Sequence, residues 1–147
     1  APVIVLLAGI ALMKAITRRF KLMLIDFKQY DVHESCYQQA WDLREQVLRT
    51  PLGLSLTAKD RDSDQNCWHF GLFMDNQIVA TVTIEPSVNE IDKPQQVKLR
   101  QMVVSPDFQN QGFGTKVIKQ IKKICFEELK AKKITANVLT AILFLAL

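Results

Sequence analysis

The sequence predicts a single mixed α/β domain in which helices flank a β-sheet. Its 147 residues suffice for one domain with a hydrophobic core and are too few for two ordinary ones. Strand-like and helix-like patterns follow one another as strand, helix, strands, helix and strand. Apolar residues make up 48% of the chain and charged residues 23%, which is typical of a globular protein and not of a disordered one.

The first 22 residues differ from the rest of the chain. Residues 1–13 carry no charge, and four basic residues follow within residues 14–21. So short an apolar run cannot cross a bilayer as a helix, and in a secretory signal the positive charge would precede it. We therefore divide the chain into an apolar extension, 1–22, and a core, 23–147. The extension is an added strand or helix, or sequence foreign to the core, with a membrane-surface anchor as the alternative.

The core begins with a strand predicted at Met23–Phe27 and a helix that runs to about Arg49, ended by Pro51 and Gly53. Apolar side chains recur along this helix at spacings of three and four. Arg44 interrupts that face. Either its stem packs on the core while its head reaches water, or its charge points into a cleft. The face comprises Tyr37, Ala40, Trp41, Arg44, Val47 and Leu48.

The middle of the chain predicts three strands separated by polar segments. Residues 58–66 contain five charges and predict a loop. Strands are expected at Cys67–Met74 and Gln77–Ile84, with a two-residue turn between them. A polar loop at Pro86–Pro94 precedes a strand at Val97–Val104. In the second strand, alternation places Ile78, Ala80, Val82 and Ile84 on one face and Val79, Thr81 and Thr83 on the other.

The last part of the chain predicts a helix from about Phe113 to Lys130 and a strand at Lys133–Val138. The apolar stripe of the helix contains Cys125, which we expect in the core. Residues 134–147 carry no charge, and we interpret them as a buried strand and the start of a helix.

Charge and cysteine content restrict the function. The net charge of +4 suits an anionic small ligand but is too small to indicate nucleic acid, and an ordinary soluble surface would also explain it. The three cysteines are far apart, with no CxxC pair. This argues against a disulfide framework and a structural zinc site, and favours a reducing compartment.

The segment Leu99–Gly114, LRQMVVSPDFQNQGFG, carries the chemistry. A strand runs into a proline-terminated turn, and two glycines then open a helix. Such a turn directs several backbone N–H groups one way, and the helix start adds partial positive charge, so the segment predicts a diphosphate site. Gly112 and Gly114 would let phosphate approach the backbone. Thr115 adds a hydroxyl and Lys116 a cation. The alternative is a glycine helix cap without a ligand.

Gln109-Asn110-Gln111-Gly112-Phe113-Gly114 resembles the Q/R-x-x-G-x-G/A signature of the GNAT family of N-acyltransferases. The signature follows a strand ending Met102-Val103-Val104 and a proline, Pro106, as is common in that family. The resemblance spans roughly residues 23–144. It implies a GNAT-like fold with a central mixed sheet flanked by helices, and a cytoplasmic, metal-free enzyme that transfers an acetyl group from acetyl-CoA to a primary amine.

The resemblance also implies residue roles. The backbone of Met102–Val104 would hold the pantetheine arm, and the N–H groups of Gln109–Thr115 the diphosphate. The Val103 amide would donate to the thioester oxygen as negative charge develops there. The amine would attack directly, without an acyl-enzyme. Glu85 and His69 are the candidate general bases, with plain surface or core roles as their alternatives.

Family members usually continue with an A-x-x-F-Y run, whose tyrosine protonates the leaving thiolate, then a helix and two strands. The matching run is Ala141–Leu145, and Leu145 stands at the tyrosine position. We therefore expect the last helix and two strands to be missing. The strand at 134–139 would then need cover from Val3–Leu7 or from a second chain, as in a homodimer, or the fold would be impaired. A catalytically impaired acyl-CoA-binding module and a structural domain remain the alternative functions.

Overall fold

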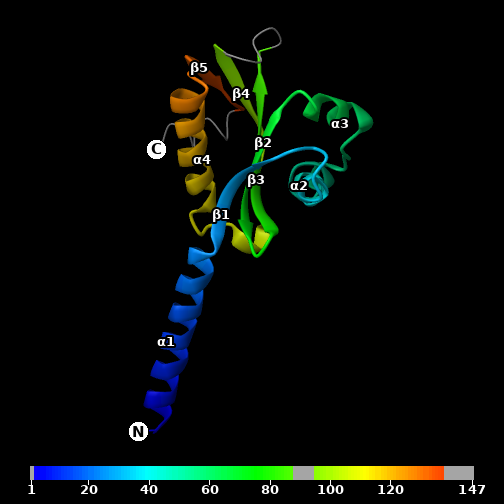
Figure 1. The fold of residues 1–147 in the computed structure, drawn as a ribbon. Coiled ribbons are helices and arrows are strands. Elements are labelled where there is room, and N and C mark those ends of the chain that lie inside the picture. Colours follow the sequence, from blue (N-terminus) through cyan, green and yellow to red (C-terminus); the bar gives the residue numbers. More distant parts are fainter. Residues whose placement is uncertain (1, 88–94, 138–147) are drawn as a thin grey trace.

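A five-stranded sheet forms the centre of the computed structural model, which describes residues 2–87 and 95–137 (Figure 1). The strand order is β1-β2-β3-β4-β5. Neighbouring strands are antiparallel except β4 and β5, which are parallel. The predicted fold, a mixed sheet flanked by helices, is confirmed. The elements are α1 (Pro2–Met23), β1 (Ile25–Tyr30), α2 (Cys36–Arg44), α3 (Ala58–Asp64), β2 (Trp68–Met74), β3 (Gln77–Pro86), β4 (Gln96–Val104), α4 (Phe113–Lys123) and β5 (Lys133–Thr135).

Helices cover both faces of the sheet. In Figure 1, α4 lies against one face and α2 and α3 against the other. The buried stripe of α4 includes Val117, Ile118, Ile121 and, in the π-helical turn Ile124–Glu128, Cys125, as the sequence predicted. On the other face, Tyr37, Ala40 and Trp41 of α2 pack with residues of β1, β3 and β4. The cores thus hold β4 between two helical layers.

Residues 58–64 form α3, where a polar loop was expected. The reason is a capping box: the Thr57 hydroxyl accepts from the Asp60 N–H, and the Asp60 carboxylate accepts from the Thr57 N–H at 2.8 Å. The helix places Asp64 inside the molecule, 4% exposed. The expected loop was therefore wrong, although its polar composition fits the exposed side of a short helix.

Two bulges alter the expected strand faces. In β3, Leu72 pairs with Ala80 but Phe73 pairs with Ile78, so Val79 is an extra residue. Ile78 therefore packs on the α2 side, whereas Ala80, Val82 and Ile84 pack on the α4 side. In β4, Thr81 pairs with Val103 but Thr83 pairs with Arg100, so two residues, 101 and 102, lie opposite one. The prediction that Ile78 shares a face with the other three residues was wrong.

The N-terminal extension forms the helix α1, which projects away from the sheet (Figure 1). Because α1 runs to Met23, β1 starts at Ile25 and not at Met23 as predicted. Val3–Leu7 lies within α1 and does not pair beside β5, so that expected cover was wrong. No helix in the described ranges is long and apolar enough to span a membrane. Residues 138–147, with the run Ala141–Leu145, lie outside the described residues, as do residues 88–94 of the second polar loop.

Candidate active site

The free edge of β4 forms one wall of the candidate site. β5 pairs only with Gln96–Lys98 of β4, so the described strands leave the edge from Leu99 to Val104 without a neighbour on that side. The β4 bulge lies within this stretch, where Gln101 has a left-handed backbone (φ 49). A bulge bends its strand and redirects the residues beyond it. The edge residues after Gln101 therefore face open space.

The register shows which backbone groups point to that edge. The Ser105 N–H donates to the Val79 carbonyl of β3 at 2.8 Å. Polar groups alternate along a strand, so Val103, paired with Thr81, also turns its N–H toward β3. Met102 and Val104 turn theirs to the open edge. The geometry thus disfavours the expected oxyanion donor, Val103, whose side chain is buried against α2, and offers Met102 and Val104 instead.

The turn after β4 leads to an uncapped helix N-terminus. Asn110 (φ 60) and Gly112 (φ 86) have left-handed backbones that reverse the chain into α4. Gly112 is the N-cap residue, and no side chain of the described residues caps the helix. The first intrahelical bond beyond it runs from the Lys116 N–H to the Gly112 carbonyl at 3.1 Å. The N–H groups of residues 113–115 therefore have no helical partner and carry the positive end of the helix dipole.

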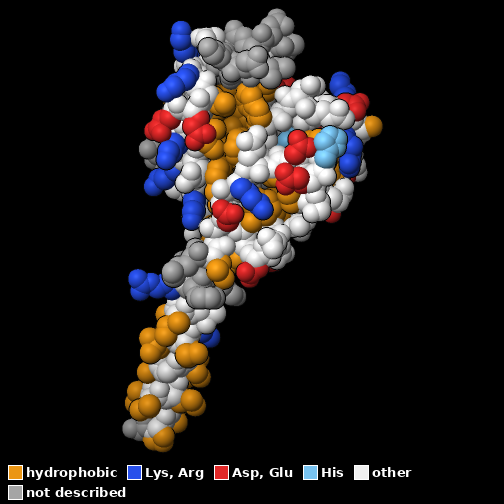
Figure 2. All heavy atoms as spheres, viewed as in Figure 1, with side chains coloured by type: hydrophobic (Ala, Val, Ile, Leu, Met, Phe, Trp, Pro, Cys, Tyr) orange, Lys and Arg blue, Asp and Glu red, His pale blue; other side chains and the backbone are white. Residues whose placement is uncertain are grey.

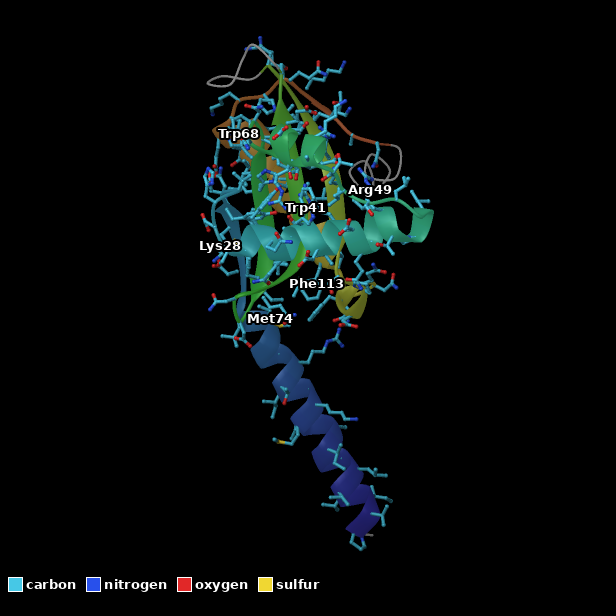
Figure 3. All side chains as sticks on the ribbon, turned by 90° about the vertical axis from the view of Figure 1, so that its right-hand side faces the viewer. Lys28, Trp41, Arg49, Trp68, Met74 and Phe113 are labelled. Carbon is cyan, nitrogen blue, oxygen red and sulfur yellow. The ribbon has the colours of Figure 1, made fainter. Side chains whose placement is uncertain are left out.

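Both features face one cavity of about 690 Å³, a size that suits a cofactor or a small ligand. The strand edge contributes Met102, Val103 and Val104, and the turn and α4 contribute most of the rest. Val47 and Leu48, after α2, also line it, as does Phe113, which Figure 3 labels at the start of α4. The lining residues are Val47, Leu48, Met102, Val103, Val104, Phe108, Gln109, Asn110, Gly112, Phe113, Gly114, Thr115 and Asn137.

Besides His69, three expected site residues lie outside this cavity. Gln111 is exposed, and its side-chain amide donates to the Asp107 carbonyl at 3.2 Å. It lines a second cavity, which lies between α1 and the rest of the domain (the body, residues 24–137). The Lys116 side chain is exposed on α4 outside the described lining. Glu85 forms an ion pair with Arg100 at 3.3 Å and borders a smaller cavity of about 260 Å³. Glu85 is therefore not among the described residues that line the 690 Å³ cavity.

His69 belongs to β2, its side chain is buried, and it is not among the described residues that line the cavity. Its Nε2 lies 2.9 Å from the Asp64 carbonyl, which can only accept, so Nε2 carries the proton. Its Nδ1 then accepts from the Thr83 hydroxyl at 3.1 Å. Burial lowers the pKa of His69, which keeps the ring neutral. Both ring nitrogens are hydrogen-bonded inside the protein. Of the two roles expected for His69, general base or core residue, the structure therefore agrees with the core residue.

The lowered pKa of His69 predicts acid-sensitive folding. Its pKa in the unfolded chain is about 6.5. Below that pH the unfolded state binds a proton that the folded state refuses, so the free energy of unfolding should fall as pH falls, by at most ~1.4 kcal/mol per unit. Urea unfolding between pH 5 and 7.5 measures this. His69→Gln should flatten the dependence and exposed His33→Gln should not; equal slopes in both variants would refute it.

The sequence did not predict the buried ion pair beside the bulge. Arg44 is 1% exposed, and its Nη2 lies 2.6 Å from Oδ2 of Asp64. The Arg44 Nη1 also donates to Oε1 of Gln101, and the Tyr37 hydroxyl donates to Asp64 at 2.6 Å. Although burial acts to lower it, the pKa of Arg44 is raised because Asp64 stabilises the charge. Neither expected role of Arg44 holds: the guanidinium reaches neither water nor the cavity, but holds the bulge residue.

Burial raises the thiol pKa of each cysteine, which disfavours a nucleophilic role. All three are free. Burial raises the pKa of Cys67 to about 11 and that of Cys125 to about 12, which keeps both as neutral thiols near pH 7. Cys125 is fully buried in the α4 stripe, as expected.

Comparisons with known proteins agree on one family. A family model described as "Acetyltransferase (GNAT) family" matches residues 28–144. The solved structures that resemble the chain include an aminoglycoside acetyltransferase from an uncultured soil metagenomic sample in complex with sisomicin (18% identity, 84% of this chain and 85% of that one, TM-score 0.62). A search of curated proteins found no match.

Two further solved structures contain acetyl-CoA. One is a predicted acetyltransferase from Clostridium acetobutylicum (14% identity, 83% of this chain and 87% of that one, TM-score 0.60). The other is a GNAT family acetyltransferase from Elizabethkingia anophelis (19% identity, 84% of this chain and 72% of that one, TM-score 0.59). At these identities the likeness concerns the fold.

Proposed function

Because the chain belongs to the GNAT family of acetyltransferases, we propose that it transfers an acetyl group from acetyl-CoA to a primary amine by direct attack in a ternary complex. The observation that carries this proposal is the convergence of two sets of backbone donors on one cavity. The open edge of β4 and the uncapped start of α4 both face it.

The two sets of donors suit the two halves of the coenzyme. The N–H groups of Phe113, Gly114 and Thr115, at the positive end of α4, would hold the diphosphate, aided by the exposed side chains of the turn. The edge of Met102 and Val104 would bond the amide groups of the pantetheine arm, as a further strand would. The thioester carbonyl would then accept from one of these two N–H groups, which replaces the Val103 role in our proposal.

The reaction needs a hydrogen-bond donor that stabilises the negative charge on the thioester oxygen, and a proton acceptor for the amine. The amine lone pair attacks the thioester carbon, the carbonyl oxygen gains charge that the β4 N–H stabilises, and the C–S bond then breaks. An amine that arrives as an ammonium ion first loses one proton to solvent, which frees the lone pair. After attack, nitrogen loses one further proton, which goes to the leaving thiolate, giving the amide and free CoA. The residues described as lining the cavity include no carboxylate, histidine or tyrosine. Most of the acceleration would therefore come from positioning the two substrates.

The same lining favours a second candidate function, an acyl-CoA-binding module that does not turn over. Its support is the lack of an ionisable side chain among the described lining residues, together with leucine at position 145 of the sequence. A cytoplasmic location goes with either function, since the free cysteines suit a reducing compartment.

Binding and turnover measured together test both functions. Acetyl-CoA at about 100 times its Kd should stabilise the fold by ~2.7 kcal/mol, seen as a thermal shift. Acetyl-pantetheine, which lacks the diphosphate, should give a much smaller shift at equal concentration. Release of free CoA thiol should follow when an amine is added, from a panel of sisomicin, a peptide N-terminus and free lysine. A shift without release would support the binding module, and no shift would contradict both functions.

A further inference from the structure

The helix α1 exposes apolar side chains on every side. Val3, Ile4, Val5, Leu6 and Leu7 are between 60% and 72% exposed. Consecutive residues advance by about 100° around a helix, so these five leave no polar face. Figure 2 shows hydrophobic side chains along the visible face of α1, whereas the rest of the domain shows charged side chains around a hydrophobic area. Such a contiguous apolar surface marks a binding site for something apolar.

The basic residues of the chain are distributed unevenly. α1 contains four, Lys14, Arg18, Arg19 and Lys21, and no acidic residue. Their sum equals the net charge of the whole chain, +4, so the residues outside α1 are balanced. The side chains of Lys14, Arg18 and Arg19 are exposed. They follow the apolar part directly and lie between it and the body.

We propose that α1 inserts its apolar part into a lipid bilayer with anionic headgroups, and so holds the domain at a membrane surface. Residues 2–13 form a helix about 18 Å long, at 1.5 Å per residue. The described apolar part of α1 can therefore reach well into a hydrocarbon core that is ~30 Å thick. With these residues inserted, Lys14, Arg18 and Arg19 reach the depth of the headgroups, where basic side chains bind anionic lipids.

Charge favours this partner over a second copy of the helix. In a parallel pair of α1 helices, the basic residues of both copies would lie side by side and repel one another. An antiparallel pair would set the basic end of each helix against the uncharged end of the other. An anionic surface instead neutralises the cluster while the lipid tails cover the apolar residues.

Sedimentation with vesicles tests the proposal on the full chain. The protein should bind vesicles of equal parts phosphatidylcholine and phosphatidylglycerol more tightly than pure phosphatidylcholine. A variant with Lys14→Gln, Arg18→Gln and Arg19→Gln should bind the anionic vesicles on the order of 100-fold more weakly, about fivefold per basic residue. The matched control changes three exposed lysines of the body, Lys119→Gln, Lys123→Gln and Lys132→Gln, and should bind like the wild type.

A second pair of variants tests insertion itself. Val5→Asp with Leu6→Asp should abolish binding to both vesicles. The change of two exposed leucines outside α1, Leu52→Asp with Leu54→Asp, should leave it intact. Three outcomes would overturn the proposal: wild type that stays in solution with anionic vesicles, equal loss in variant and control, or a concentration-dependent dimer without vesicle binding. The last would assign α1 to a second copy. The acetyl-CoA thermal shift is independent of all of these results.

Discussion

Replacing Arg44 with methionine should lower the free energy of unfolding by about 3–5 kcal/mol, because it leaves the Asp64 carboxylate buried without its cation. Arg44 and Asp64 are 1% and 4% exposed, and two guanidinium nitrogens contact the carboxylate, at 2.6 and 3.2 Å. Methionine keeps most of the packing volume, so the effect reports the charge and its hydrogen bonds. Urea unfolding at pH 7 measures it.

A matched control is available in Arg61, whose guanidinium lies over the ring of Trp41, as that of Arg44 does. Arg61 is exposed, so Arg61→Met should cost less than about 1 kcal/mol. Combining Arg44→Met with Asp64→Leu should recover much of the loss, since no charge then remains buried. If Arg44→Met costs no more than Arg61→Met, the buried pair does not contribute as the geometry indicates.

The sequence predicted the fold because its patterns were long or carried clear turn chemistry. The strands at 67–74, 77–84 and 97–104 agree with β2, β3 and β4 to within two residues, and the start of α4 was predicted at Phe113. The errors have physical causes. α3 has only seven residues, too few to show helical periodicity, and its capping box was the available signal.

The bulge at Gln101 and the buried pair that supports it could not be predicted from the sequence. The order of apolar and polar residues along 97–104 does not reveal an extra residue. Leu99, Met102 and Val104 are compatible with more than one pairing of this strand with its neighbour. Arg44 was recognisable as the polar member of an apolar face, but its partner lies 20 residues away in a segment expected to be a loop. The family resemblance implied Val103 as the oxyanion donor, but the Ser105 N–H bond to the Val79 carbonyl indicates that the Val103 N–H faces β3. Our proposal therefore gives that role to Met102 or Val104.

Replacing Gly112 with glutamate should abolish measurable acetyl-CoA binding while the domain stays folded. Gly112 is the N-cap of α4 and lines the cavity. A carboxylate there would repel the diphosphate: two unit charges 4 Å apart interact by about 4 kcal/mol at an effective dielectric constant of 20. We therefore expect at least a 100-fold rise in Kd, measured by calorimetry. The left-handed backbone of Gly112 (φ 86) should also cost about 1–2 kcal/mol of stability.

Gly53 separates the two effects of that substitution. It has a similar left-handed backbone (φ 68), and a Cβ built on either glycine meets no atom within 4 Å. Gly53 lies outside the described cavity lining. Gly53→Glu should therefore lose a similar amount of stability and keep its affinity. Equal affinities in the two variants, with the wild type binding acetyl-CoA, would mean that the coenzyme does not place its diphosphate at the start of α4, because backbone strain alone would then explain everything Gly112→Glu does.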